Sequence, residues 1–408
     1  MKIKLNEVIS DFIVPMRDKP KVFDKGIPWC RIEDIEGKYL SNTLSAKYVS
    51  DETINSMNLK VYPINTLLFS CSATIGTIAI TKKPLCTNQT FIGLVASDKI
   101  NIEYLYYYFK IIGNSLKKAA SITTIPYLSR SFFENLEINI HENINEQKRI
   151  VSILSDLDKK IEINNKIVRK LEAKSMVIYN YWFVQFEFPN ENGKPYKSSG
   201  GKMIYNKNLK KMIPKGWETE IITKSCKIVD CLHSKKPNQV KKSPYFLLQL
   251  ENINDNGLID ISNKFKVSIT DYLKWTSRIE VKENDILITN AGRVAANAQI
   301  PKGLRSGIGR NITTIRPKTI NPTFLFLSIR GHHIQEQILS NTDVGSFFKS
   351  FNVKNIKKLQ LIRPSEKIEF EFEKIVRSIR EERELMQKQN QKLAELRDWL
   401  LPMLMNGQ

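Results

Sequence analysis

The sequence predicts a mixed α/β (α+β) protein with two repeated globular domains. The domains are separated by two long antiparallel helices, which form a coiled coil in a pseudo-twofold arrangement. Three observations predict this fold. Two stretches, Glu146 to Trp182 and Glu366 to Leu401, carry an apolar heptad pattern, the second pattern follows the first by 225 residues, and similar apolar runs precede both. An apolar period of 3.5 residues is typical of a coiled coil because it keeps one stripe facing a partner helix.

The heptad seam is interrupted by polar residues at corresponding places. The first seam runs through Ile150, Leu154, Leu157, Ile161, Asn164, Val168, Leu171, Ser175 and Ile178. The second runs through Ile368, Phe372, Ile375, Ile379, Glu382, Met386, Gln389, Leu393, Leu396 and Leu400. A polar residue in a coiled-coil core weakens the coil but fixes its register, whereas the alternative is that Asn164 and Gln389 merely tolerate solvent. In an antiparallel pair centred on Asn164 the two amides would meet and satisfy each other. Pro402 is expected to end the second helix.

Length and composition limit the class of protein. A chain of 408 residues is expected to form two or three domains. It has no apolar run of about 18 residues, so we expect no membrane span, and its first residues lack a signal-peptide core, so we expect a cytoplasmic protein. Five cysteines without paired spacing suit a reducing compartment and a structural role. Cys226, Cys231 and His233 lie close in sequence but lack a second ligand pair, so we expect no metal, with zinc as the minor alternative.

The net charge of +21 favours a polyanionic partner, since 63 lysines and arginines face 42 acids. A lysine-rich surface can also follow from genome composition. Charge therefore points to nucleic acid without proving it.

The predicted elements follow in chain order. Residues 1–145 form the first globular domain, with strands at Thr66 to Ser70, Thr77 to Ile80, Thr90 to Val95 and Leu136 to Ile140, and a helix at Glu103 to Lys118. The expected parts after it are a helix at 146–182, a connector rich in turn formers at 183–217, a second globular domain at 218–365 and a last helix at 366–408. A shift of 219 places Leu67 to Ser70 on Ile286 to Thr289, which indicates tandem duplication.

Paired helices of this length could hold two globular domains at a fixed separation along DNA. Ile150 to Ile178 spans roughly 42 Å at about 1.5 Å per residue, slightly more than one turn of B-DNA at about 34–36 Å. Two dissimilar domains held apart by these helices would read two different half-sites. The competing interpretation is that the domains bind proteins and the coil is only a spacer.

Motifs for catalysis are missing from the sequence. It has no Gly-Lys-Ser/Thr phosphate loop, no Asn/Asp-Pro-Pro-aromatic motif and no glycine-rich loop for a methyl donor. Asp158 and Lys160 resemble half of a nuclease signature, but on a coiled coil we expect a solvated helix face. No catalytic residue and no cofactor are therefore expected in this chain.

The helices and the connector carry a family resemblance. The relevant segments are Glu146 to Val151 (EQKRIV), Leu157 to Ile161 (LDKKI), Trp182 to Phe186 (WFVQF), Lys197 to Met203 (KSSGGKM), Ile213 to Glu218 (IPKGWE) and Leu396 to Gln408 (LRDWLLPMLMNGQ). Because these segments occur together and in this order, the chain resembles the specificity (S) subunit of type I restriction-modification systems, the HsdS family. The globular domains match only in outline, best at Ile27 to Ile32.

The resemblance implies two target recognition domains that read a bipartite, asymmetric site on double-stranded DNA. It also implies docking of two methyltransferase (M) subunits and of restriction (R) subunits, with S-adenosylmethionine, ATP and Mg on those partners. The chain itself would be non-catalytic. The alternatives are a DNA-independent interaction scaffold, or the specificity subunit of a methyltransferase-only or type IIB-like system.

Residues that read bases are expected in loops at strand ends, where Arg, Lys, Asn, Gln, Ser and Thr reach base edges. In the first domain the candidates are Ser72, Thr74, Asn88, Gln89, Thr123, Thr124 and Arg130. In the second they are Asn290, Arg293, Arg305, Arg310, Asn311, Ser346 and Lys349. Each is also compatible with an ordinary surface role.

Overall fold

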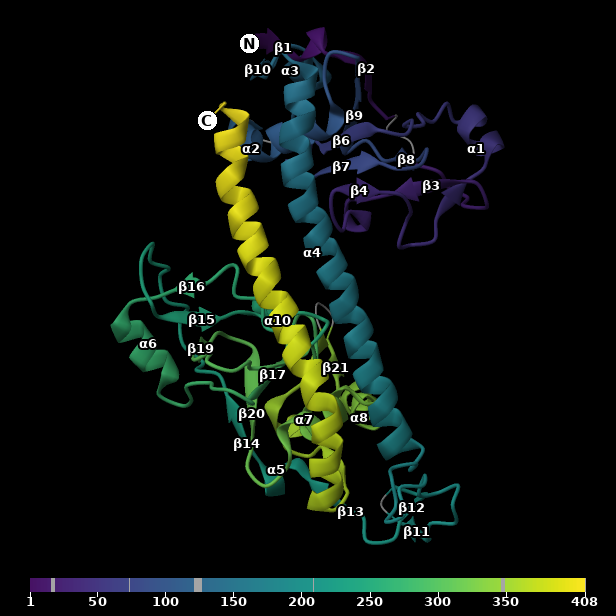
Figure 1. Cartoon of the computed structure of the whole chain (residues 1–408), viewed down its shortest axis with the longest axis vertical. Coiled ribbons are helices and arrows are strands. Elements are labelled where there is room, and N and C mark those ends of the chain that lie inside the picture. The colour runs from purple at the N-terminus through teal and green to yellow at the C-terminus, as the bar shows by residue number, and fades with distance from the viewer. Residues whose placement is uncertain (16–18, 73, 121–126, 208, 346–348, 408) are drawn as a thin grey trace. The chain divides into compact units, whose positions relative to one another are not determined.

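The computed structural model describes residues 1–15, 19–72, 74–120, 127–207, 209–345 and 349–407. The chain divides into two compact units: unit 1 is Met1–Ile161 with Lys392–Gln408, and unit 2 is Glu162–Gln391. Each unit contains a globular α/β part and one segment of each long helix, α4 (Ile144–Tyr179) and α10 (Glu366–Met405) (Figure 1).

The core of unit 1 is a five-stranded sheet in the order β2-β9-β6-β7-β4. Its strands are β2 (Ile9–Ile13), β9 (Phe91–Ala96), β6 (Thr66–Ser70), β7 (Ile78–Thr81) and β4 (Tyr39–Leu40). Every residue of β6 is buried, because a central strand covered on both faces needs a continuous apolar run rather than alternation. All pairings are antiparallel except that of β4 with β7.

Smaller elements complete unit 1. They are the sheet β5 (Tyr48–Val49), β3 (Ile27–Cys30) and β8 (Cys86–Thr87), the pair β1 (Lys2–Lys4) and β10 (Glu137–Asn139), and helices α1 (Asp51–Ser56), α2 (Ile102–Ala120) and α3 (Arg130–Glu134). Helix α2 packs on the central sheet, where the Phe69 and Phe109 ring centroids lie 5.5 Å apart.

The core of unit 2 is a four-stranded antiparallel sheet in the order β14-β20-β17-β18. Its strands are β14 (Cys226–Asp230), β20 (Ile312–Pro317), β17 (Ile286–Thr289) and β18 (Asn297–Gln299). Around it lies a three-stranded sheet of β16 (Phe265–Lys266), β15 (Phe246–Leu248) and β19 (Gly307–Ile308). Two strand pairs complete the set: β13 (Glu218–Ile221) with β23 (Gln360–Arg363), and β21 (Asp343–Val344) with β22 (Lys349–Ser350). The helices are α5 (Ile222–Ser225), α6 (Ile269–Thr276), α7 (Pro322–Arg330), α8 (His332–Ser340) and α9 (Val353–Ile356).

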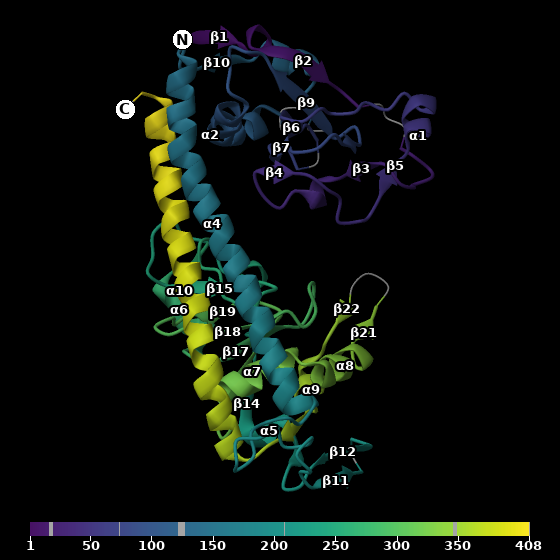
Figure 2. The same ribbon diagram turned by 45° about the vertical axis from the view of Figure 1, so that its right-hand side comes forward.

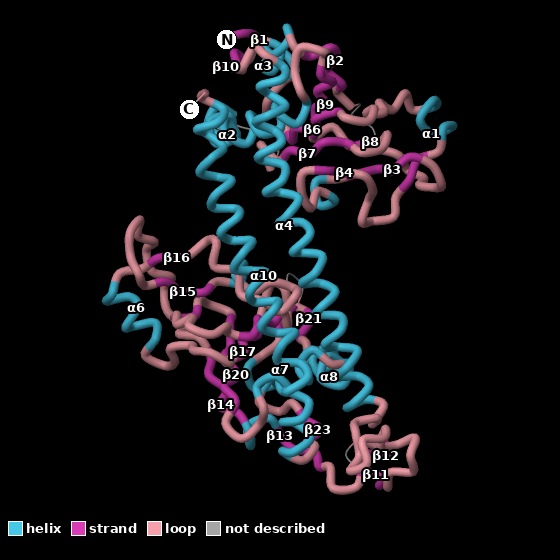
Figure 3. The backbone as a smooth tube through the Cα atoms, viewed as in Figure 1, coloured by secondary structure: helices cyan, strands magenta, loops and turns pink. Residues whose placement is uncertain are grey.

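The two units repeat one topology, as the sequence predicted. The order β2-β9-β6-β7 corresponds to β14-β20-β17-β18, and β5-β3-β8 corresponds to β16-β15-β19. The pair β1–β10 corresponds to β13–β23, and α2 corresponds to α7 in chain order (Figure 3). The prediction of two repeated mixed α/β domains with long helices is therefore confirmed.

Helices α4 and α10 pack antiparallel within each unit (Figure 2). In unit 1, Ile150 and Leu154 share a core with Leu401 and Met405. In unit 2, the Asn164 side chain contacts Gln389, and the Tyr179 and Phe372 ring centroids lie 6.3 Å apart. Because residue numbers rise along one helix as they fall along its neighbour, the direction is antiparallel in both units.

The seam predicted for α10 was partly wrong. Ile375 is 45% exposed and Leu396 is 43% exposed, whereas their neighbours Val376 and Arg397 turn inward. The inner stripe of α10 also carries the buried Arg383. Arginines therefore occupy inner positions of α10, where a heptad pattern predicts apolar side chains. They do so because carboxylates of α4 pair with them.

Pro402 does not end α10, which continues to Met405. A proline inside a helix removes one backbone hydrogen bond and costs roughly 3 kcal/mol. Burial of Leu401 and Met405 in the unit 1 core favours the extra turn.

The connector is more ordered than a series of turns. A π-helical turn (Asn180–Val184) follows α4, and the hairpin β11 (Met203–Asn206) and β12 (Lys211–Pro214) follows later. The Phe188 ring stacks on Tyr196 at 4.6 Å and on Trp217 at 5.2 Å between centroids, which fixes the segment on unit 2.

No helix within the described ranges combines the length and the apolarity needed to cross a lipid bilayer. All five cysteines are free and buried. Burial raises the pKa of the thiols of Cys30, Cys71, Cys86 and Cys226 to about 12.

We predict that these thiols are unreactive in the folded chain. At pH 8 an aromatic disulfide reagent should modify them at least roughly a hundredfold more slowly than in concentrated urea, because the thiolate is the reactive form. Absorbance of the released thiol measures both rates. A native chain with any thiol reacting at the unfolded rate would contradict the burial described above.

Candidate nucleic-acid interface

The central strands of both units end at corresponding edges of their sheets. In unit 1 the backbone N–H of Cys71, just after β6, donates to the carbonyl of Thr90, just before β9, at 2.7 Å. In unit 2 the N–H of Asn290, just after β17, donates to the carbonyl of Asn311, just before β20, at 2.8 Å. We call these places edge 1 and edge 2.

A third segment closes each edge in the same way. At edge 1 the N–H of Leu128 donates to the Cys71 carbonyl at 3.1 Å, and Ser72 bridges to Tyr127. At edge 2 the N–H of Phe351 donates to the Asn290 carbonyl at 2.7 Å, and Ala291 bridges to Ser350. Residues far apart in sequence thus build the same framework twice, and the side chains on it differ.

Asn290 holds edge 2 together. Its Nδ2 donates to the carbonyl of Phe351 at 3.1 Å, and its Oδ1 accepts from the Thr313 hydroxyl at 3.0 Å. Both the Nδ2 and the Oδ1 of Asn290 are hydrogen-bonded, and the residue is half-buried. Asn290 therefore connects three segments of unit 2.

Three other predicted residues present free groups at edge 2. Arg310, Asn311 and Lys349 are exposed. Asn311 adopts a φ of 62°, a left-handed conformation that asparagine tolerates in a tight turn. Within the described part of the chain the exposed Arg310 guanidinium makes no hydrogen bond or ion pair. Arginine and asparagine are the side chains that read guanine and adenine by bidentate hydrogen bonds.

Edge 1 carries smaller polar groups. Asn88 Oδ1 accepts from the Thr90 hydroxyl at 2.5 Å and from the Thr90 N–H at 3.4 Å, which shapes the turn into β9. Gln89 beside it is exposed, as is Thr74 in the loop between β6 and β7, and Ser72 is half-buried. The sequence-predicted Thr123, Thr124 and Ser346 lie outside the described residues.

Three arginines predicted as base readers are engaged by their own chain. Arg130 donates to Glu134 at 2.7 Å and to the Phe12 carbonyl at 3.2 Å. Arg305 pairs with Glu280 at 3.3 Å. Arg293 donates to Asp255 at 2.6 Å, to the Leu250 carbonyl at 3.2 Å and to the Ile253 carbonyl. Arg293 therefore ties the β17–β18 loop to the 250–255 segment.

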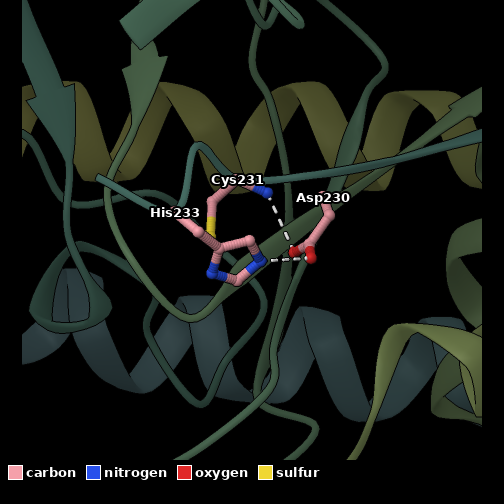
Figure 4. Close-up of side chains that lie close together, drawn as sticks. All are labelled: Asp230, Cys231 and His233. Atoms are coloured by element: carbon pink, nitrogen blue, oxygen red, sulfur yellow. Dashed lines mark hydrogen bonds and ion pairs between the residues drawn. The ribbon is translucent and has the colours of Figure 1, made fainter.

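Sequence reasoning missed Asp230, which ends β14 beside edge 2 (Figure 4). Its Oδ1 accepts from the Cys231 N–H at 2.9 Å and the Thr313 hydroxyl at 3.3 Å, and its Oδ2 lies 2.7 Å from His233 Nε2. His233 is mostly exposed and adds an imidazole to the edge. The signal for this group was the closeness of Cys231 and His233 in the sequence, which had been considered only for a zinc site, as the minor alternative.

The ligand atoms of Asp230, Cys231 and His233 lie within 4.8 Å of one another. Structural zinc sites use four protein ligands, whereas this group offers three, and both carboxylate oxygens already accept hydrogen bonds. Burial raises the pKa of Cys231, so its thiol is protonated at neutral pH. Cys226, the other cysteine nearby in sequence, begins β14 and lies at its far end. The arrangement stabilises the turn after β14 and offers one protein ligand fewer than a structural zinc site uses.

The amides of the helix pair meet at the end of unit 2's helix contact, next to the boundary with unit 1 along both helices. Asn164 Nδ2 donates to Asn390 Oδ1 at 2.9 Å and to Gln389 Oε1 at 3.4 Å. Asn390 in turn donates to Asn165 Oδ1 at 2.8 Å. Asn165 and Asn390 were not singled out from the sequence, although the 225-residue shift relates them just as it relates Asn164 and Gln389.

Comparison with known proteins gives a consistent result. The family model described as "Type I restriction modification DNA specificity domain" matches residues 15–173. The specificity subunit of the type I restriction enzyme MjaIX from Methanocaldococcus jannaschii is 25% identical over 393 residues, which cover 94% of this chain and 86% of that one. The HindI specificity subunit from Haemophilus influenzae is 25% identical over 356 residues, covering 74% of each chain.

A solved structure shares the fold. The crystal structure of the type I restriction-modification S subunit from M. genitalium superposes with a TM-score of 0.52 at 15% sequence identity, covering 99% of this chain and 96% of that one. In such systems the specificity subunit is not itself catalytic. The repeated topology, the two long helices and these matches make the chain similar to the specificity subunits (HsdS family) of type I restriction-modification systems.

Proposed function

We propose that the chain reads a bipartite, asymmetric site on double-stranded DNA through edge 1 and edge 2. In this proposal 1–145 and 218–365 are target recognition domains in a pseudo-twofold arrangement, and 183–217 connects the two halves. The helices at 146–182 and 366–408 form the spacer. The observation that carries the proposal is that one framework is built twice with different exposed side chains.

The chemistry of edge 2 supports base readout. Arg310 and Asn311 offer donors and an acceptor in the patterns that guanine and adenine present in the major groove. Lys349 and His233 flank them as exposed groups suited to phosphate contact.

The contrast between the edges supports an asymmetric site. Where edge 2 exposes Arg310, edge 1 exposes the neutral Gln89 just before β9. Different donors and acceptors at equivalent places select different bases, so two unlike half-sites follow.

The connector supports a sequence-independent contribution. Residues 192–217 contain seven lysines and no acidic residue, and the hairpin β11–β12 with its aromatic anchor holds several of them in place. Lysines that meet phosphates release counterions and strengthen binding to any DNA sequence.

Exposed apolar side chains on the helices support docking of partner subunits. On α10 they include Phe370, Leu385 and Trp399, and on α4 they include Ile153, Ile163 and Val177. Large apolar groups gathered on exposed helix faces mark protein interaction sites. We assign these faces to two methyltransferase (M) subunits, with restriction (R) subunits joining the complex. S-adenosylmethionine, ATP and Mg would act on those partners, and the complex would work in the cytoplasm.

Salt dependence of DNA binding tests the proposal. The chain, co-purified with a methyltransferase subunit from the same host, should bind duplex DNA with an affinity that falls steeply as salt rises. Binding that is absent or insensitive to salt would instead support a DNA-independent interaction scaffold. Methylation without any cleaving partner in the same host would support a methyltransferase-only or type IIB-like system.

We predict that Arg310→Ala relaxes discrimination at one base pair of the unit 2 half-site, by about 1–3 kcal/mol. Arg293→Ala should instead lower the free energy of unfolding by about 1 kcal/mol, because it breaks hydrogen bonds within the chain on a half-exposed side chain. Competition binding with single-base variants measures the first effect and urea unfolding measures the second. Equal loss on specific and random DNA in Arg310→Ala would refute its role in base reading.

We also predict that the triple change Lys202→Gln, Lys207→Gln and Lys215→Gln weakens binding to all sequences alike. The slope of log affinity against log salt should fall by up to about 3, at about 0.9 per lost phosphate contact. The matched control changes the exposed Lys224, Lys227 and Lys318, which lie at the end of the unit 2 sheet opposite edge 2. An equal effect in both triples would mean that the connector has no special part in DNA binding.

A further inference from the structure

Two carboxylates on α4, Asp158 and Glu172, are shielded from solvent. Their side chains are 17% and 16% exposed. A solvated helix face was expected for Asp158, and that expectation was wrong. Burying a carboxylate is costly unless charged or hydrogen-bonding partners compensate, so the partners show what each group does.

In unit 1, Asp158 joins three helices. Its Oδ1 accepts from Arg397 Nη1 of α10 at 2.7 Å, and its Oδ2 accepts from the Tyr107 hydroxyl of α2 at 2.6 Å. Burial and this hydrogen bond raise the pKa of Tyr107, so the phenol remains a donor. One carboxylate thereby fixes α2, which lies on the central sheet, to both long helices.

The Asp158 contact continues into the sheet of unit 1. Lys38 Nζ lies 3.4 Å from the Tyr107 hydroxyl and 2.8 Å from Glu103 Oε2. The Tyr39 hydroxyl of β4 donates to the other Glu103 oxygen at 2.5 Å. Burial lowers the pKa of Lys38, as expected for an ammonium group enclosed by α2 and β4. A continuous series of polar contacts therefore connects β4, the outermost strand of the unit 1 sheet, with α10.

In unit 2, Glu172 makes the corresponding connection. Its Oε1 accepts from Arg330 Nη2 of α7, and its Oε2 lies 3.6 Å from Arg383 Nη2 of α10. Arg330 also donates to Asn297 of β18 at 3.3 Å and to the Asp255 carbonyl at 2.9 Å. Burial lowers the pKa of the Arg383 guanidinium to about 10, and its charge is balanced by Glu172.

The two arrangements are related by the repeat. Helices α2 and α7 are equivalent, and each gives a donor to an α4 carboxylate that also faces an α10 arginine. Asp158 and Glu172 lie one heptad before and one heptad after Asn165. Their arginines lie one heptad after and one heptad before Asn390, the partner of Asn165.

We infer that Asp158 and Glu172 are positioning residues, each of which orients one recognition domain on the helix pair and so sets which bases its edge meets. The inference rests on the proposed function. Readout by hydrogen bonds requires donors held within about 0.5 Å of the productive geometry. A domain that loses its carboxylate contact should therefore tolerate wrong bases in its own half-site and leave the other half-site unaffected.

The test uses the complex with the methyltransferase subunit and a panel of duplexes in which each base of the site is changed singly. Asp158→Asn and Glu172→Gln keep the shape and remove the charge. Asp156→Asn and Glu162→Gln are matched controls, because these α4 carboxylates are exposed and, among the described residues, their ion pairs are with Lys159 and Lys166 on the same helix. The edge variants Asn88→Ala and Arg310→Ala identify which half-site belongs to which unit.

We expect Asp158→Asn to lower the methylation preference for correct bases about tenfold in the unit 1 half-site alone, and Glu172→Gln to do so in the unit 2 half-site alone. A tenfold change corresponds to about 1.4 kcal/mol, within the range for a hydrogen bond to a charged group. Both control variants should keep the selectivity of the original chain. Tyr107→Phe removes only the donor from α2 and should relax the unit 1 half-site even if Asp158→Asn folds poorly.

Unchanged selectivity in both halves, or equal relaxation of both halves by each variant, would overturn the positioning role. The second outcome would indicate a general loss of stability. If the original complex methylates no split site, the proposed function itself fails, and that result is recognised before any variant is compared.

Discussion

The antiparallel contact between α4 and α10 is the constraint on which the rest of this structure depends. In unit 2 this contact includes a buried polar position, because Asn164 is fully buried and donates to Gln389 and Asn390. Asn164 Oδ1 has no hydrogen-bond partner among the described residues, so the amide weakens the contact while it restricts the register. The ion pairs between carboxylates on α4 and arginines on α10 also restrict the register, since a shift of either helix would leave buried charges unpaired.

The chain repeats one backbone framework, once in each unit, and the side chains on that framework differ between the units. The hydrogen bond from Cys71 to Thr90 in unit 1 and that from Asn290 to Asn311 in unit 2 are the same backbone connection. Backbone hydrogen bonds and buried strands such as β6 and β17 preserve the sheet, while the loops at its edge are free to change. Duplication followed by divergence at the edges thus gives two different surfaces without a second fold.

Much of this architecture could be predicted from the sequence, because its signals are strong and local. The buried strands β6 and β17 appear as continuous apolar runs, and the helices appear as heptads. The failures that concern charged residues share one physical cause: a charge is assigned to solvent when its partner is distant in sequence. Arg293 is 38 residues from Asp255, Arg130 is 118 residues from the Phe12 carbonyl, and Arg397 is 239 residues from Asp158. An ion pair of this kind also turns Arg397 inward on α10, where Leu396 had been expected.

The central claim is that two unlike reading edges, joined by one helix pair of fixed register, define one split DNA site. The most direct measurement is a map of N6-methyladenine across the DNA of a host that expresses the chain with its methyltransferase subunit. We expect a single asymmetric motif in two parts, separated by a gap of constant length. A palindromic motif, a variable gap, or no methylation despite a stable complex would contradict it.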